Sequence, residues 1–285
     1  MGNGIAHTFA LYGYEVMLVD KSDQALEKAL KAIHHNLQRQ VDKEKITGQM
    51  KENAIQSLRI SNSIDQISQQ SQLVVEAVPE RLKLKQDIFL ALEAHVHKDC
   101  ILATNTSSIS ITAIASVLTH RRRVIGMHFM NPVPVMPLVE VIRGYDTGEE
   151  TLECILEMAA IINKTPVVVQ DYPGFVANKI LMPMINEAID TLHRGIADVK
   201  GIDTIMQLGM AHPMGPLKLA DYIGLDTCLS ILRVLYDGFG DPKYAPSPLL
   251  VKMVTAGKLG VKSGEGFYDW NKDRKSPPVA TFFDL

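Results

Sequence analysis

The stretch MGNGIAHTFALYGYEVMLVD, residues 1–20, decides the fold that we expect. Residues 1–14 have a helical pattern, because small residues come first and Ile5, Phe9 and Tyr12 follow on one side. Residues 15–20 have the pattern of a short buried strand that ends in an acid. Together they indicate the second half of a strand–turn–helix–strand nucleotide site. The strand that should come first is missing from this stretch.

Gly2 and Asp20 are the residues of this stretch for which we predict a contact with a dinucleotide. Gly2 fits the third glycine of G-x-G-x-x-G, where the lack of a side chain lets helix and strand pack closely, although a glycine near a helix start is commonplace. Asp20 ends the strand, where an acid can bond both hydroxyls of a ribose. A carboxylate there repels a 2′-phosphate, so NAD is favoured over NADP. The alternative for Asp20 is a helix cap before residues 22–30.

Apolar runs alternate with amphipathic segments as far as residue 170. The runs that predict strands are LVVEAV (73–78), CILAT (100–104), RVIGMHF (123–129), LVEVIRG (138–144) and PVVVQD (166–171). Repeated β–α–β units of this kind predict a parallel sheet covered on both faces. Strand patterns largely vanish after DYPGF (171–175), and the predicted helices there are 175–194, 202–209, 216–236 and 247–256. We therefore predict an α/β domain over residues 1–170 and an all-α domain over residues 171–285.

Composition argues against several classes of partner. The 285 residues are 46% hydrophobic and 21% charged, as in an ordinary globular protein, and a net charge of −3 gives no reason to expect nucleic acid or an anionic membrane. No apolar run approaches the roughly 18 residues that a membrane span needs. Cys100, Cys154 and Cys228 lie far apart without CxxC spacing. This spacing argues against a metal site and against disulfides, and it favours the cytoplasm.

Three polar residues follow one another in TNTSSISITAIASVLTHRRRVIGMHFMNPVPVMPLVEVI, residues 104–142. Ser107 comes after one strand, His128 ends the next, and Glu140 lies in the third. We expect strands that end on the same edge of a parallel sheet to deliver all three to the cofactor crevice. A histidine with a carboxylate behind it is a general base held in one tautomer. Taken alone, however, a histidine on an apolar strand is more often a core residue, and spacing does not decide between the two.

Longer motifs identify a family. From Met1 to Trp270 the chain contains, in order, MGNGIA…D, VVEAVPERLKLK, NTSS, GMHFMNPVPVM-LVEVI, PGFVANKILMPMINEA, HPMGPLKLADYIGLD and KSGEGFYDW. These motifs closely resemble the 3-hydroxyacyl-CoA dehydrogenase family, and above all its stand-alone bacterial 3-hydroxybutyryl-CoA dehydrogenases. The resemblance implies a Rossmann-like, doubly wound, mostly parallel sheet. It also implies an all-α C-terminal domain that completes the active site and forms a homodimer.

The resemblance also implies roles for the catalytic residues. His128 matches the family's general base, which takes the proton of the substrate 3-hydroxyl, and Glu140 matches the partner that orients it. Ser107 matches the serine that bonds the substrate oxygen near the nicotinamide. Asn178, in PGFVANK, matches an asparagine brought to that oxygen from the second domain. Without the resemblance, Asn178 would be read as a polar helix residue that faces solvent.

Further residues match contacts to the cofactor and to coenzyme A. Glu80, Lys85 and Lys262 match cofactor contacts, as Gly2, Asp20 and Ser107 do. For coenzyme A the predicted contacts are Asn36, Arg39, Lys43, Ser107 and Asn131. The first three of these are spaced +3 and +4, which places them on one helix face, where two cations could meet phosphates. The alternative is a charged stripe that is only solvated.

The sequence departs from the family pattern at two places. Pro137 stands where the family usually has lysine, and we expect it to disturb a strand edge rather than the chemistry, because Glu140 is not shifted. Family members also carry a first strand and a G-x-G-x turn ahead of the Met-Gly that opens this chain. In a doubly wound sheet that strand is central. We therefore expect Met1 to be an internal methionine of a longer enzyme.

The sequence predicts an NAD-dependent oxidoreductase that acts reversibly on (S)-3-hydroxyacyl-CoA thioesters, with short acyl chains. A rival of the same class is a hydroxyacid or sugar-acid dehydrogenase on the same scaffold, which the predicted coenzyme A face disfavours. A rival of another class is a non-catalytic dimeric relative that the missing strand has disabled. Binding of NAD by this chain would separate the second rival from the enzyme.

Overall fold

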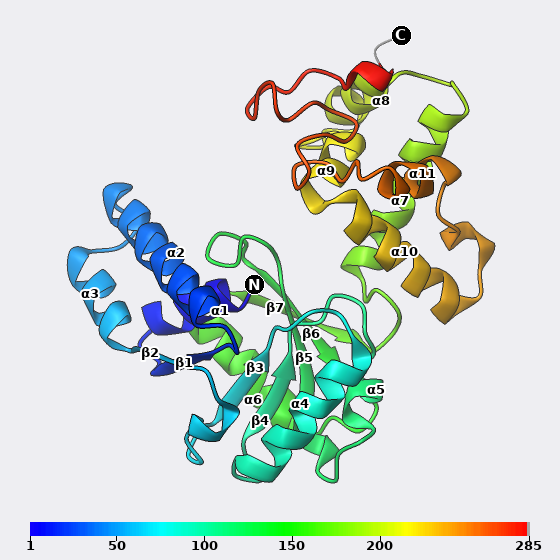
Figure 1. Ribbon diagram of the computed structural model, residues 1–285. Coiled ribbons are helices and arrows are strands. Elements are labelled where there is room, and N and C mark those ends of the chain that lie inside the picture. Colours follow the sequence, from blue (N-terminus) through cyan, green and yellow to red (C-terminus); the bar gives the residue numbers. More distant parts are fainter. Residues whose placement is uncertain (284–285) are drawn as a thin grey trace. The chain divides into compact units, whose positions relative to one another are not determined.

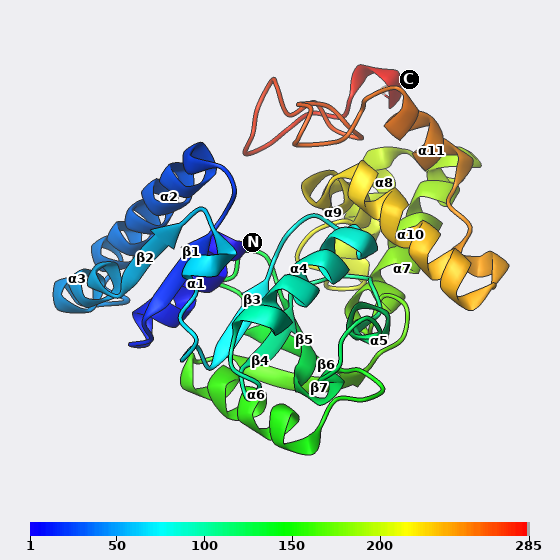
Figure 2. The ribbon, with the colours of Figure 1, turned by 60° about the horizontal axis from the view of Figure 1, so that its bottom comes forward.

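The computed structural model describes residues 1–283. The chain divides into two compact units, Met1–Tyr172 and a second unit that begins at Pro173. Figures 1 and 2 show strands and helices in the first unit and mainly helices in the second. Within residues 1–283, no helix is both long and apolar enough to cross a membrane.

The first unit has the predicted Rossmann-like α/β architecture, with its strands in two sheets. One sheet has the order β1-β2 and the other the order β3-β4-β5-β6-β7. The strands are β1 (Val16–Val19), β2 (Leu58–Ser61), β3 (Leu73–Glu76), β4 (Ile101–Thr104), β5 (Val124–Phe129), β6 (Leu138–Arg143) and β7 (Thr165–Gln170). The helices are α1 (Gly2–Leu11), α2 (Asp23–Asp42), α3 (Gly48–Gln56), η1 (Ile64–Gln66), α4 (Leu82–His95), α5 (Ile111–Ala115), η2 (Arg121–Arg123) and α6 (Glu149–Ile161).

Helices cover both faces of the larger sheet because its strands are apolar on both sides. Every residue of β5 is buried. One face packs against α1 and α6, through a cluster that includes Phe9 and Ile155. In Figure 1, α4 and α5 lie on the opposite face. The first helix therefore belongs to the core, and its N-terminus is held in place by packing.

The pairing of β5 with β6 differs from the expectation of strands that all end on one edge. These two strands are antiparallel, whereas β3–β4, β4–β5 and β6–β7 are parallel. The physical reason is the connection, residues 130–137, because a parallel pair needs a crossover of about a dozen residues or more. Glu140 therefore reaches His128 as its register partner across the ladder.

The helix α3 and the strand β2 were not predicted from the sequence. In α3 only Ala54 is buried, so its apolar periodicity is weak. Strand β2 is four residues long and exposes its two central residues, but it pairs in parallel with β1. Elements this short and polar are specified by their neighbours more than by their own pattern.

The second unit is a helical domain around an apolar cluster. Its helices are α7 (Ala177–His193), α8 (Val199–Thr204), η3 (Ile205–Gly209), α9 (Pro216–Ile223), α10 (Leu225–Phe239), η4 (Pro242–Tyr244), α11 (Pro248–Thr255) and η5 (Thr281–Phe283). The predicted continuous helix over residues 216–236 is wrong, because the chain breaks between α9 and α10. Gly224 has a φ of 99° there, a conformation that L-residues with a side chain rarely adopt.

A buried carboxylate fastens the segment that follows α11 to this helical core. The Asp221 side chain accepts hydrogen bonds from the backbone N–H groups of Phe267 and Tyr268 and from the Trp270 indole N–H, at 2.9–3.0 Å. The hydroxyl of Tyr268 donates to Asp203 at 2.6 Å. Burial raises the pKa of Asp221 to about 6.

Replacing Asp221 with alanine is expected to lower the free energy of unfolding by about 3 kcal/mol or more, because three buried donors lose their acceptor. The folded-state pKa of Asp221 is raised, so its titration stabilises the fold as pH falls through about 6. The stability gap between the wild type and Asp221→Ala should therefore widen between about pH 7 and pH 4. Denaturant titrations across this range measure it. Asp190→Ala, which removes an exposed pair with Arg194, is the control and should cost far less.

Candidate active site

His128 and Glu140 are in hydrogen-bond contact in the first unit. The His128 Nδ1 atom lies 2.8 Å from a Glu140 carboxylate oxygen. Both residues are buried, with exposed fractions of 7% and 2%. Because β5 and β6 pair through these two positions, the strand ladder itself sets the distance between the side chains. A carboxylate on Nδ1 fixes the ring orientation and directs Nε2 to the other side.

Ser107 lies just after β4, in a turn held by Glu80. The Glu80 carboxylate accepts hydrogen bonds from the backbone N–H of Ser107 at 2.5 Å and from the Thr106 hydroxyl at 2.9 Å. Both residues come from the family motifs, but the sequence did not predict their contact with each other. Glu80 thus fixes the backbone of the turn that carries Ser107.

Lys85 lies behind Glu80 and is buried. Its ammonium group donates to both carboxylate oxygens of Glu76, at 2.8 and 3.0 Å, and lies 3.3 Å from a carboxylate oxygen of Glu80. Glu76 also accepts a hydrogen bond from the Thr104 hydroxyl. With an exposed fraction of 1%, Lys85 is positioned to orient Glu80, and its contact with the cofactor stays a prediction.

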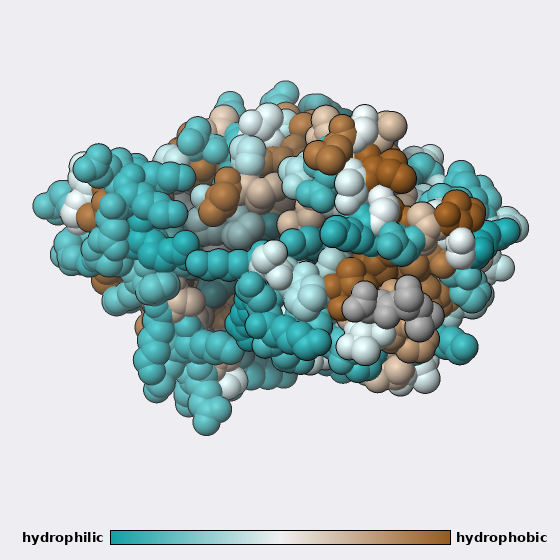
Figure 3. Space-filling model, turned by 90° about the horizontal axis from the view of Figure 1, so that it is seen from above, coloured by the Kyte–Doolittle hydropathy of each residue, from teal (hydrophilic) through white to brown (hydrophobic). Residues whose placement is uncertain are grey.

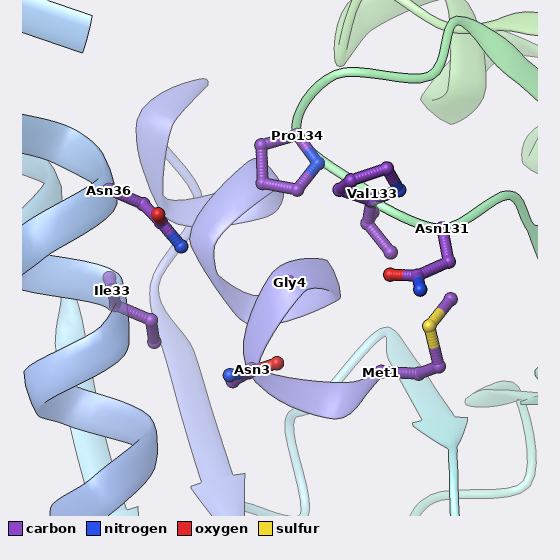
Figure 4. A pocket seen from close by; sticks show the side chains of 9 residues that line it. Met1, Asn3, Gly4, Ile33, Asn36, Asn131, Val133 and Pro134 are labelled. Carbon is purple, nitrogen blue, oxygen red and sulfur yellow. The ribbon is translucent and has the colours of Figure 1, made fainter. Parts of the chain in front are cut away.

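The N-terminus of α1 lines a pocket with a volume of about 200 Å3. Figure 4 shows that its walls come from the start of α1, from α2 and from the loop after β5. The lining residues are Met1, Asn3, Gly4, Ile33, Asn36, Asn131, Pro132, Val133 and Pro134. The pocket thus brings together Asn36 and Asn131, two predicted contacts of coenzyme A that lie far apart in the sequence.

Gly2 was expected to allow close packing of helix and strand, but the closer approach in α1 is at Gly4 and is made to the loop after β5. A Cβ atom on Gly2 would meet Ala77 at 3.8 Å, which is an ordinary contact. A Cβ atom on Gly4 would lie 3.0 Å from the Val133 Cβ atom. Gly4 is therefore the glycine of α1 that allows the loop after β5 to approach the helix. The predicted role of Gly2 in cofactor binding is not tested by this packing.

Arg39 and Lys43 extend along α2 away from Asn36, and both are exposed. Arg39 lies in the last turn of the helix, whereas Lys43 is the residue that follows its end. Hydrophilic side chains gather over α2 and α3, at the left of Figure 3. The predicted face is thus accessible, and its contact with coenzyme A stays a prediction.

Asp20 does not cap α2, which removes the alternative considered for it. The N-cap of α2 is Ser22, whose hydroxyl accepts from the Ala25 N–H. The Asp20 carboxylate instead accepts a hydrogen bond from the Ser22 N–H at 3.0 Å, at the exposed end of β1. This is the place where the predicted ribose contact requires an acid.

Pro137 comes directly before β6. Its carbonyl oxygen accepts a hydrogen bond from the Thr165 N–H at 2.8 Å, and Glu140 keeps its register with His128. Proline is tolerated at the start of a strand because it lacks only the donor. Glu140 thus pairs with His128 directly downstream of Pro137, whereas the expected disturbance of a strand edge stays a prediction.

Asn178 and Lys262 belong to the second unit. Asn178 lies in the first turn of α7 and is buried. The Lys262 ammonium group donates to the Asp226 carboxylate and to the Thr227 hydroxyl, both at 2.8 Å. Their predicted contacts with substrate and cofactor stay predictions.

Both units of the chain resemble known proteins. Residues 1–172 match the NAD binding domain of 3-hydroxyacyl-CoA dehydrogenase, and residues 174–270 match its C-terminal domain. The chain is 50% identical over 272 residues to a probable 3-hydroxybutyryl-CoA dehydrogenase of Bacillus subtilis, covering 95% of this chain and 94% of that protein. It is 48% identical over 281 residues to the 3-hydroxybutyryl-CoA dehydrogenase of Bradyrhizobium diazoefficiens, covering 99% and 94%.

A solved structure shares the fold as well. The crystal structure of (S)-3-hydroxybutyryl-CoA dehydrogenase from Ralstonia eutropha matches with a TM-score of 0.90 at 46% identity, covering 93% of this chain and 94% of that one. This chain belongs to the 3-hydroxyacyl-CoA dehydrogenase family. Its cofactor is accordingly NAD, and it is an oxidoreductase.

The residues at the start of α1 and the end of β1 fit NAD. The first turn of α1 contains no acid, and no side chain caps it within the described part of the chain. A helix end of this kind suits a pyrophosphate, because its N–H groups and dipole attract anions. Asp20 directly follows β1, and its hydrogen bond to a ribose stays a prediction.

Sequence reasoning missed several residues that shape this dehydrogenase site. Glu76 was read only as an internal residue of the predicted strand 73–78, although it is the anion that holds Lys85. Asn3 was read only as part of a helix start, although it lines the pocket. Glu76 and Asp20 are both acids at the end of an apolar strand. This position was the sequence signal that could have indicated a role for Glu76 in the site. Asn3 offered none, because nothing local distinguishes it.

Proposed function

We propose that this protein oxidises the 3-hydroxyl group of (S)-3-hydroxyacyl-CoA thioesters with NAD, and that it also catalyses the reverse reduction. The acyl chain is short, as in 3-hydroxybutyryl-CoA, the compound named for the relatives at 46–50% identity. The observation that carries the proposal is the buried contact between His128 and Glu140. It supplies the general base that oxidation of an alcohol requires.

In this proposal, Nε2 of His128 takes the proton of the substrate hydroxyl. NAD, when bound, supplies the nicotinamide ring that accepts the hydride from C3. Glu140 holds the imidazole ring through Nδ1 and stabilises the charge that the ring gains. In the reverse direction His128 returns the proton to the new hydroxyl. A positioned base of this kind contributes roughly 10²–10⁴ to the rate.

Ser107 and Asn178 are the proposed donors to the substrate oxygen. Donors that are fixed in advance stabilise a developing charge without reorganisation. Glu80 supports this role for Ser107, because its carboxylate accepts a hydrogen bond from the Ser107 N–H and fixes the turn. The Lys85 ammonium group in turn contacts the Glu80 carboxylate. For Asn178 the support is the family motif PGFVANK.

A spectrophotometric assay of NAD reduction with 3-hydroxyacyl-CoA thioesters of increasing chain length tests the proposal. We expect the largest kcat/KM with the shortest substrates. Turnover of a free hydroxyacid or sugar acid, and none of any thioester, would favour the rival dehydrogenase. Absence of NAD binding in calorimetry would favour the non-catalytic rival.

Asp20→Ala is expected to narrow the preference for NAD over NADP, because the substitution removes a carboxylate that repels the 2′-phosphate. The ratio of kcat/KM values for the two cofactors should fall by roughly tenfold, or about 1.4 kcal/mol. Asp23→Ala, on the neighbouring first turn of α2, is the matched control and should leave the ratio unchanged. A wild-type enzyme that already prefers NADPH would contradict this assignment.

The double substitution Arg39→Glu with Lys43→Glu is expected to raise the KM for the CoA thioester by roughly tenfold or more, since two cations become anions near phosphates. A pantetheine thioester, which lacks those phosphates, should be affected little. Lys98→Glu with Lys275→Glu changes the net charge equally at other exposed positions and serves as the control. An equal effect on both thioesters would place Arg39 and Lys43 away from the phosphates.

The second unit is the proposed interface of a homodimer. Four apolar side chains between residues 196 and 210 are more than half exposed, which is unusual for a surface that only solvent covers; they are Ile196, Ile205, Leu208 and Met210.

The cytoplasm remains the proposed location of the protein, supported by three cysteines that are not disulfide-bonded.

A further inference from the structure

Lys164 is a buried cation in the turn between α6 and β7. Its exposed fraction is 8%. Its ammonium group donates to the carbonyl oxygens of Val133 at 2.6 Å and Met136 at 2.8 Å. Burial lowers the pKa of the Lys164 ammonium group. Burying a charge is costly, so its two hydrogen bonds are the compensation that keeps it there.

Both carbonyls belong to residues 130–137, the loop that connects β5 to β6. The far side of this loop rests on α1, where a Cβ atom on Gly4 would come within 3.0 Å of Val133. Asn131, Pro132, Val133 and Pro134 form one wall of the pocket in Figure 4. The loop is thus held between α1 and the Lys164 ammonium group.

We propose that Lys164 is a positioning residue for the dehydrogenase. By holding residues 130–137 it sets the pocket wall that carries Asn131, opposite Asn36, the two predicted coenzyme A contacts that line this pocket. This inference rests on the proposed function. The ladder pairing of β5 with β6 holds His128 opposite Glu140 independently of the loop. Lys164 therefore acts on substrate binding, with little effect on the chemical step.

Lys164→Met keeps the length and the apolar stem of the side chain but removes all donors. We expect the KM for 3-hydroxybutyryl-CoA to rise about tenfold, the equivalent of one charge-assisted hydrogen bond, while kcat changes by less than about threefold. Lys164→Gln, which retains an N–H donor, is expected to give an intermediate KM and provides a second variant if Lys164→Met does not fold. Lys164→Arg should restore a KM close to that of the wild type.

Arg123→Met is a matched control. Arg123 is also a buried cation of the first unit, and it donates to the carbonyl oxygens of His97 at 2.7 Å and Cys100 at 3.4 Å. It precedes β5, whereas the loop follows β5. Its loss should lower stability without raising the KM.

An unchanged KM in folded Lys164→Met or Lys164→Gln would overturn the inference, as would an equal rise of KM in Arg123→Met. Calorimetric binding of acetoacetyl-CoA gives the same comparison without turnover. Wild-type protein that binds this thioester but oxidises no 3-hydroxyacyl-CoA would refute the proposed function, and the binding of the variants would still decide the role of Lys164.

Discussion

His128→Gln is expected to lower kcat for 3-hydroxybutyryl-CoA oxidation by roughly 10²–10⁴, because the general base is removed. The affinity for NAD should change little, since His128 lies in β5, a strand that contains none of the predicted cofactor contacts. Glutamine retains the approximate size of histidine and can still meet Glu140. A structural collapse is therefore not the expected cause of the loss.

Steady-state kinetics and calorimetric NAD binding, measured on the same preparations, test this expectation. His95→Gln is a suitable control, because His95 also forms a short ring contact, to the Ile67 carbonyl oxygen at 2.7 Å, but lies at the end of α4. Its kcat should remain near that of the wild type. Glu140→Gln should lower kcat as well, by less than His128→Gln, because an amide can orient the ring but cannot stabilise its positive charge. If kcat survives in His128→Gln, the mechanism is wrong.

The second large effect is expected from adding an apolar strand, ending in G-x-G-x, ahead of Met1. The strands β1 and β3 belong to separate sheets, and no ladder joins them in the described residues. Gly2 nevertheless lies within 4 Å of both Leu18 in β1 and Ala77 just after β3, measured from an added Cβ atom. Val16, Leu73 and Val75 are only partly buried, although they pack against the same cluster.

An added strand would pair with the edges of β1 and β3 and cover these apolar side chains. Each backbone hydrogen bond that forms is worth about 0.5–1.5 kcal/mol net, so the extended chain should be more stable by several kcal/mol. Two more N–H groups at the start of α1 should tighten NAD binding about 100-fold, at roughly 1.4 kcal/mol each.

Thermal unfolding and NAD titration of the two chains measure these effects. An extension of the same length made of Gly and Ser is the control, because it adds chain without strand propensity. Equal stability and equal NAD affinity in all three proteins would contradict the expectation. Tight NAD binding by the 285-residue chain would contradict the expectation that the glycines of the added G-x-G-x turn contribute to NAD affinity.

The repeating patterns of the sequence determined most of the elements and several of the site residues. Alternation of apolar runs with amphipathic segments predicts the strands β3 to β7, because burial on both faces requires long apolar runs. Asp20 was placed at the end of β1 by the same logic. The family motifs then assigned roles to His128 and Glu140 that spacing could not assign.

Only the tertiary structure decided which of these residues meet. A pattern of side chains shows which face of an element is buried, but it does not name the partner on the other side. The antiparallel pairing of β5 with β6 depends on the length of the loop between them. The contacts of Lys85 with Glu76 and of Lys164 with its loop join residues that are distant in sequence. The same is true of Gly4, whose importance comes from Val133. Such contacts arise because packing and hydrogen bonding are satisfied across the whole domain, and the sequence pattern of one segment does not specify its partner in another.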